Sequence, residues 1–67
     1  SQLFTFVREA FQQRRKMLHH AVNRHAPGAV EEISHQTGID LKRRAETLTL
    51  EEFAELANAI YDFNRQD

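Results

Sequence analysis

The hydrophobic positions of residues 3–25 repeat with the period of an α-helix. At about 100° per residue, one broad face collects eight apolar side chains: Leu3, Phe4, Val7, Ala10, Phe11, Leu18, Ala21 and Val22. Arg14 falls in the middle of this face, where a cation is costly to bury unless it is paired. We therefore predict that the chain bends or breaks near residues 12–15, with helices over about 3–12 and 15–25. The alternative is a straight helix in which Arg14 pairs with a glutamate of another helix.

The next segment carries a clear start and stop for a third, shorter helix. Ala26-Pro27-Gly28, the only cluster of proline and glycine in the chain, ends the second helix. A helix over about 29–37 then places Val30 and Ile33 inward. Gly38 follows where a helix favours a left-handed residue, and a hydrophobic residue comes next, as is common after such a cap.

The last helix has the strongest local signature. Thr49 suits the N-cap, and Glu52, three residues later, completes a capping box. Leu48 and Phe53 have the spacing of a hydrophobic staple, so the helix should run over about 50–64. Its core-facing residues are expected to be Phe53, Leu56, Ala57 and Ile60. Residues 40–48 form a connection in which Asp40 could cap a single helical turn.

These patterns predict an all-α fold, a small bundle of four to five short helices with no sheet. The 67 residues allow one domain at most, so we treat residues 1–67 as a single helical domain. There are no cysteines, and therefore neither a disulfide nor a thiolate metal site can stabilise the fold. No apolar run approaches the length of a membrane span. The chain begins on a helical pattern without a methionine, and we expect it to be a fragment of a longer protein.

The net charge of −1 hides an asymmetry along the chain. Residues 1–25 carry a net charge of +4 and residues 26–67 a net charge of −5. A basic segment within a nearly neutral chain indicates a focal contact with a polyanion. The alternative is that the two halves are solvated faces that attract one another.

The basic residues are the main candidates for function. Phe11 and Leu18, both expected to be buried, flank the consecutive cations at positions 14–16, and a second basic segment follows at 42–44. Guanidinium and ammonium groups bind phosphate oxygens well. The candidate RNA-binding residues are Arg14, Arg15, Lys16, Lys42 and Arg43. Because neither segment is interleaved with aromatic residues, we expect contact with the backbone of folded RNA or DNA and no base stacking.

No catalytic or metal-binding pattern is present in the sequence. The four histidines, His19, His20, His25 and His35, include no pair at the i, i+4 spacing, and Ser34 has no recognisable base partner. We therefore expect no catalytic residue, no metal site and no enzymatic activity in the isolated chain.

Several motifs together resemble one family. The run Phe4-x-Phe6-Val7-Arg8-x-Ala10-Phe11-x-Gln13-Arg14-Arg15-Lys16-x-Leu18 is similar to the start of the C-terminal helical domain of small-subunit rRNA adenine N6-dimethyltransferases of the KsgA type. Further matches follow in the family's order at Gly38-Ile39-Asp40, Arg44-x-Glu46-x-Leu48-Thr49 and Glu51-Glu52-Phe53-x-x-Leu56-Ala57-Asn58. Thr49 replaces the usual serine, and residues 18–25 match no family pattern.

The resemblance implies a parent enzyme that transfers methyl groups from S-adenosylmethionine to two adjacent adenines of small-subunit rRNA during ribosome biogenesis, in the cytoplasm. It places the cofactor site in an N-terminal catalytic domain that is absent from this chain. It implies that this chain helps to position the enzyme on rRNA. Arg14, Arg15 and Lys16 match the basic residues with which the family contacts rRNA. The expected partners are small-subunit rRNA, the assembling small ribosomal subunit and that N-terminal domain, with no membrane. Two alternatives stay open for Arg44 and Glu46: a structural ion pair between them, or a contact with RNA.

Other readings remain open from sequence alone. Close variants are the equivalent domain of a large-subunit antibiotic-resistance methylase or of a mitochondrial transcription-factor relative. The chain could also be a structural or protein-interaction helical domain with no nucleic-acid role. A DNA-binding helix-turn-helix is less favoured, because the turn at 26–28 leads into a helix that begins with Glu31 and Glu32.

Overall fold

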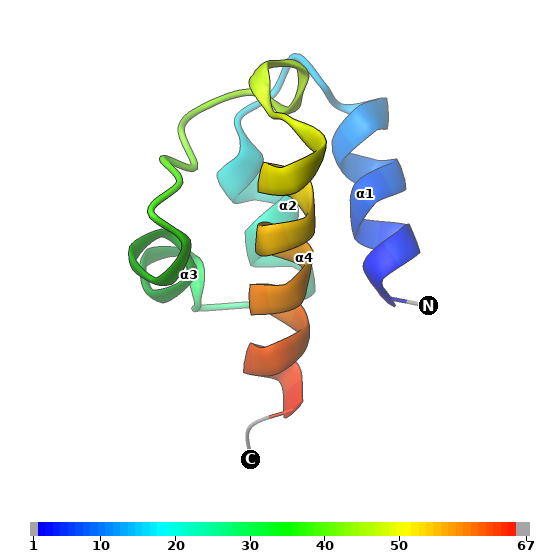
Figure 1. Ribbon diagram of the computed structural model, residues 1–67. Coiled ribbons are helices and arrows are strands. Elements are labelled where there is room, and N and C mark those ends of the chain that lie inside the picture. Colours follow the sequence, from blue (N-terminus) through cyan, green and yellow to red (C-terminus); the bar gives the residue numbers. More distant parts are fainter. Residues whose placement is uncertain (1, 66–67) are drawn as a thin grey trace.

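The computed structural model describes the backbone of residues 2–65 and the side chains of residues 5–65. In this part of the chain there are four α-helices, α1 (Gln2–Gln12), α2 (Leu18–His25), α3 (Val30–Thr37) and α4 (Leu50–Arg65), and a short 3-10 helix, η1 (Ala45–Thr47). Helix α1 packs against α2 and α4, and α3 packs against the same two helices (Figure 1). The described residues form no strand or sheet, so the predicted all-α class is confirmed.

The apolar faces of the four helices and of the connection before η1 meet in one core. Its largest fully buried side chains are Phe6, Leu18, Val22, Ile33 and Leu56. The remaining buried apolar side chains are Ala10, Ala26, Ala29, Ile39, Leu41, Ala45, Phe53, Ala57, Ala59 and Ile60. The four positions predicted to face inward from the last helix all belong to this core. Val30 is partly buried against it, next to the fully buried Ile33.

The inward face of α1 differs from the predicted one. Phe6, which the predicted stripe omits, is 1% exposed, whereas Phe11, which was expected to be buried, is 49% exposed. The stripe was traced as if one helix continued through residues 3–25, but α1 ends at Gln12. Phe6 and Ala10, one turn apart, face the core, and Phe11 lies at its rim on Phe53 with ring centroids 5.0 Å apart. The predicted inward positions of Leu3 and Phe4 lie outside the side chains that are described.

The predicted break between the first two helices is confirmed. The chain leaves α1 after Gln12 and turns through a hydrogen bond from the Lys16 N–H to the Gln13 oxygen, at 2.9 Å. Arg14 is exposed within this turn, which excludes the straight helix with a buried Arg14. The second helix begins at Leu18, later than the predicted residue 15, because Met17 is extended (φ −66°, ψ 145°) and pairs with another segment.

The helix-end signals in the second half of the chain act as predicted. Gly38 ends α3 with φ 73°, a left-handed conformation that glycine adopts without steric cost. The Thr49 hydroxyl accepts the Glu52 N–H at 3.1 Å, and the Glu52 carboxylate accepts the Thr49 N–H at 2.9 Å, which completes the capping box. Asp40 also caps a single turn, as the sequence allowed: its carboxylate accepts the Lys42 N–H at 2.9 Å and its backbone oxygen accepts the Arg43 N–H at 3.1 Å. This turn precedes η1.

Candidate nucleic-acid interface

The turn between α1 and α2 presents three cations to solvent. Arg14, Arg15 and Lys16, here called the basic turn, are all exposed. Among the described residues, none of their side chains forms a hydrogen bond or an ion pair. Together with residues 11–13 they line a shallow hollow at the end of α1. Three unpaired cations on a single turn can contact adjacent phosphates without first breaking an intramolecular interaction.

Backbone pairing brings the second basic segment to the same place. Met17 and Arg44 form an isolated antiparallel bridge. The Leu18 N–H donates to the Arg43 oxygen and the His19 N–H to the Leu41 oxygen, both at 2.9 Å. The turn before α2 therefore lies beside the segment before η1, at the end of the molecule where α1 stops and α4 starts (Figure 1). The backbones of the two basic segments, far apart in the sequence, therefore lie side by side.

In the second segment, Arg43 is held by internal contacts. Its guanidinium donates to both carboxylate oxygens of Glu52, at 2.7 and 3.2 Å, and to the backbone oxygen and hydroxyl of Thr47, at 2.6 and 3.2 Å. The hydrogen bonds from Arg43, and then that from the Thr49 backbone, lower the pKa of the Glu52 carboxyl below its ordinary value. The same Glu52 contact raises the pKa of Arg43. Arg43 thus joins the connection to α4, and its contact with RNA stays a prediction.

Lys42 and Arg44 lie on either side of this anchored arginine. Both are exposed, and neither side chain has a hydrogen-bond or ion-pair partner among residues 5–65. The Arg44–Glu46 pair that the sequence allowed is therefore not formed. Arg44 adds a free cation next to Met17, and Lys42 adds one at the edge of a neighbouring hollow.

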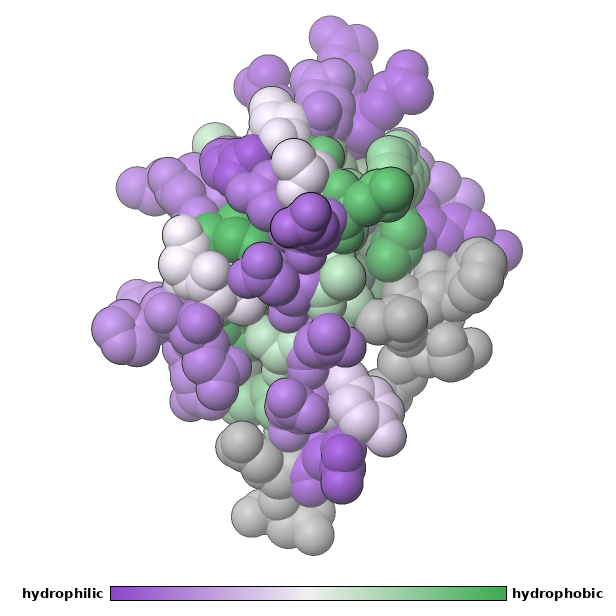
Figure 2. All heavy atoms as spheres, viewed as in Figure 1, coloured by the Kyte–Doolittle hydropathy of each residue, from purple (hydrophilic) through white to green (hydrophobic). Residues whose placement is uncertain are grey.

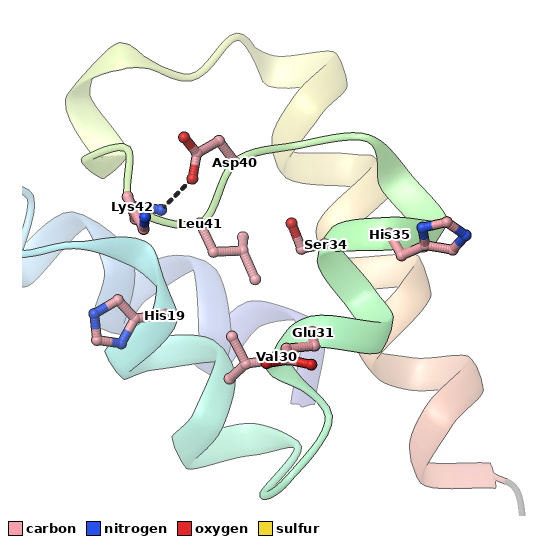
Figure 3. Close-up of a pocket in the computed structure, with 8 residues that line it drawn as sticks. All are labelled: His19, Val30, Glu31, Ser34, His35, Asp40, Leu41 and Lys42. Carbon is pink, nitrogen blue, oxygen red and sulfur yellow. Dashed lines mark hydrogen bonds between the residues drawn. The ribbon is translucent and has the colours of Figure 1, made fainter.

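That hollow, of about 390 Å³, lies between α2, α3 and the segment that joins α3 to η1. Figure 3 shows His19 and His35 on opposite sides of it, with Leu41 and Val30 between them. The Ser34 hydroxyl donates to the Ile39 oxygen at 2.7 Å. The histidines do not converge on a common point, and the described residues contain no group of three side chains able to hold a metal ion. The lining offers no nucleophile paired with a base.

Exposed apolar side chains accompany the cations, a feature that the sequence reasoning missed. Among the described side chains, the large apolar residues left exposed are Phe11, Met17, Leu50 and Tyr61; Met17 directly follows the basic turn, and Phe11 lines the same hollow as its three cations. Figure 2 shows an apolar area next to the strongly polar end of the molecule. The sequence carried one signal, since Phe11 and Met17 lie close to the cations along the chain, but Phe11 was expected to be buried because it belonged to the predicted apolar stripe.

A second missed feature fixes the two helices on either side of the basic turn. His25, in the last turn of α2, contacts the Glu9 carboxylate of α1 at 3.1 Å, and its ring packs edge-on against Phe6. Arg24 lies 3.8 Å from the same carboxylate, and the Asn64 amide of α4 donates to the His25 oxygen at 2.9 Å. The contacts of His25 join α1, α2 and α4, whereas the exposed Arg24 pair contributes little to stability. The sequence gave no indication of these contacts, because Glu9 and His25 belong to different helices.

The fold and this surface define a class: a small helical module that presents an exposed cationic turn. The chain is homologous to part of bacterial proteins named ribosomal RNA small subunit methyltransferase A, which confirms the resemblance found in its motifs. It is 46% identical to that of Geobacillus sp. (strain WCH70), and 43% identical to those of Bacillus thuringiensis (strain Al Hakam) and Bacillus mycoides (strain KBAB4). Each alignment of 63 residues covers 85% of this chain.

The similarity is confined to a minor part of each relative. The chain spans only 22% of the length of these proteins, so most of their sequence has no counterpart here. No protein-family model matches the chain, and no solved structure matches it significantly. Among the described residues, no helix is both long and apolar enough to cross a membrane.

Proposed function

We propose that the chain is the rRNA-docking C-terminal domain of an rRNA adenine dimethyltransferase, and that its basic turn contacts the phosphates of small-subunit rRNA. The observation that carries this proposal is the state of Arg14, Arg15 and Lys16, which are exposed, unpaired and grouped on one turn of a fixed scaffold. Lys42 and Arg44 extend the same surface. Arg43 contributes mainly by neutralising Glu52 beside it, which keeps a carboxylate from repelling the phosphates.

In this proposal the chemistry takes place elsewhere in the parent protein. S-adenosylmethionine binds an N-terminal catalytic domain outside this chain, and that domain methylates two adjacent adenines while the small ribosomal subunit assembles in the cytoplasm. The names of the relatives support an rRNA methyltransferase as the parent. Phosphate contacts position a protein on its nucleic acid without reading the sequence, which is the task of a docking domain.

The test is binding of the 67-residue chain to a labelled small-subunit rRNA fragment, measured by fluorescence anisotropy. Replacing Arg14, Arg15 and Lys16 with alanine should weaken binding strongly while leaving the thermal unfolding midpoint unchanged, because none of the three side chains has a partner among residues 5–65. The control, Arg24→Ala with Arg65→Ala, removes two cations outside the basic turn and should retain binding. A folded triple variant that binds as well as the wild type would refute the docking role and leave a structural or protein-interaction domain.

A further inference from the structure

The exposed apolar residues near the basic turn line a groove between α1 and α4. Its lining consists of Val7, Phe11, Leu50, Phe53, Ala54 and Ala57. Leu50, on one wall, is 84% exposed, and Phe11, on the other, is 49% exposed. Leaving two large apolar side chains in water sacrifices the stabilisation that their burial would provide. A contiguous group of exposed apolar side chains next to a cationic surface indicates a contact site for a partner.

Phe11 belongs to both surfaces. It lines the groove and also the hollow formed by residues 11–16, so the apolar groove and the basic turn are continuous. Its ring is stacked on that of Phe53, with centroids 5.0 Å apart and an angle of 24° between the planes. One face of the ring is therefore fixed by the core while about half of the side chain remains available. An aromatic ring held in this way loses little conformational entropy when it binds a second planar group.

We propose that this groove receives an unpaired base of the RNA whose phosphates contact the basic turn. The inference rests on the proposed RNA-docking function and adds the kind of RNA that the surface fits. Proteins recognise single-stranded loops and bulges by stacking the splayed bases on aromatic side chains, and they contact the flanking phosphates with cations. The groove supplies the apolar wall and the exposed ring, and the adjacent turn supplies the cations. This proposal departs from the sequence-based expectation that the RNA backbone alone is contacted.

Charge complementarity favours RNA over a protein segment as the occupant. The groove is continuous with Arg14, Arg15 and Lys16, whose side chains have no counter-ion among the described residues. Glu52, in the first turn of α4, is already paired with Arg43 at 2.7 Å and so does not oppose an incoming phosphate. A purely apolar protein segment would cover the groove but would leave these cations without a partner.

The experiment compares two hairpins from small-subunit rRNA that differ at one position. In one, 2-aminopurine is an unpaired bulge, and in the other it is paired within the stem. We expect the 67-residue chain to bind the bulged hairpin about tenfold more tightly and to quench its fluorescence, since a base–aromatic stack contributes an affinity difference of this order. Phe11→Leu, which keeps an apolar side chain but removes the ring, should abolish the preference and the quenching.

Two further variants make the result specific to the groove. Leu50→Ser, at a side chain too exposed to affect folding, should reduce the preference for the bulge in the same direction. Tyr61→Leu removes an aromatic side chain of similar exposure further along α4 and should change nothing. If both hairpins bind equally and Phe11→Leu and Leu50→Ser have no effect, the inference is wrong, the docking proposal stands, and the groove receives a protein segment instead. If neither hairpin binds, the docking proposal fails and the inference fails with it.

Discussion

Met17 and Arg44 pair through their backbones, although helices α2 and α3 separate them in the sequence. The pairing continues into α2, whose Leu18 and His19 N–H groups donate to the oxygens of Arg43 and Leu41. The first N–H groups of a helix usually need a side-chain cap or water, and here a second segment of backbone satisfies them. The same hydrogen bonds place the two basic segments side by side. The shape of the candidate interface therefore depends on a tertiary contact.

The pairing of α2 with the segment before η1 can be tested by hydrogen exchange. The amide protons of Leu18 and His19 should exchange slowly, because they are bonded to a separate segment and open only when that segment detaches. The amides of exposed Arg14 and Arg15 form no such bond to another segment among the described residues and should exchange quickly. Amide exchange followed by NMR measures both sets in one sample. Rapid exchange at residues 18 and 19 would mean that the two basic segments are not held together.

The capping box at the start of α4 can be tested by stability. Thr49→Ala removes the hydroxyl that accepts the Glu52 N–H and should lower the free energy of unfolding by roughly 1 kcal/mol. For a domain of this size, such a loss lowers the melting temperature by about 4–8 °C. Thr49→Ser, which keeps the hydroxyl, is the control and should melt close to the wild type. Equal melting of all three proteins would show that the cap contributes nothing.

The Arg43–Glu52 pair predicts a dependence of stability on pH. Because folding lowers the pKa of Glu52 from its ordinary value of 4.5, the ionised carboxylate stabilises the fold above that pH, and the stabilisation is lost as the pH falls through the lower folded-state pKa. Glu52→Gln should therefore be less stable than the wild type at pH 7. The difference should shrink below pH 4.5. Chemical denaturation at several pH values measures it, and a difference that persists unchanged into acid would contradict the ionic contribution.

The two phenylalanines of α1 should respond very differently to truncation. Phe6 is 1% exposed in the core, so Phe6→Ala should cost about 3–5 kcal/mol and unfold much of the protein. The same change at Phe11, at the rim of the core, should cost less than half as much free energy of unfolding, and the variant should remain folded. Thermal unfolding followed by circular dichroism compares them. Equal losses would indicate that Phe11 is a core residue, as the sequence pattern suggested.

Much of the fold could be read from the sequence because its signals are local. Gly38, the proline–glycine turn and the Thr49–Glu52 box each lie within a few residues of the helix end that they specify, and the structure has a helix end at each of them. The position of Arg14 on an otherwise apolar stripe correctly indicated the break after α1. The family motifs spanned the same elements, and the comparisons confirmed that resemblance.

The details of the surface could not be read in this way, because they arise from contacts between distant segments. The start of α2 depends on the pairing of Met17 with Arg44, and the exposure of Phe11 depends on where α1 ends. The role of Arg43 is set by Glu52, and that of His25 by Glu9. None of these partners is adjacent in sequence or related by helical spacing within one helix. Whether the five candidate cations bind RNA stays a prediction.

The most direct test of the docking proposal is the salt dependence of binding to a small-subunit rRNA fragment. The logarithm of the binding constant should fall linearly with the logarithm of salt concentration, with a slope of about −0.7 to −0.9 per phosphate contacted. The Arg15→Ala, Lys16→Ala variant should bind more weakly with a slope shallower by about 1.4 to 1.8. The Arg24→Ala, Arg65→Ala control, with the same change in net charge, should keep the wild-type slope. Identical slopes for all three proteins would contradict the account, since the basic turn would then contact no phosphate.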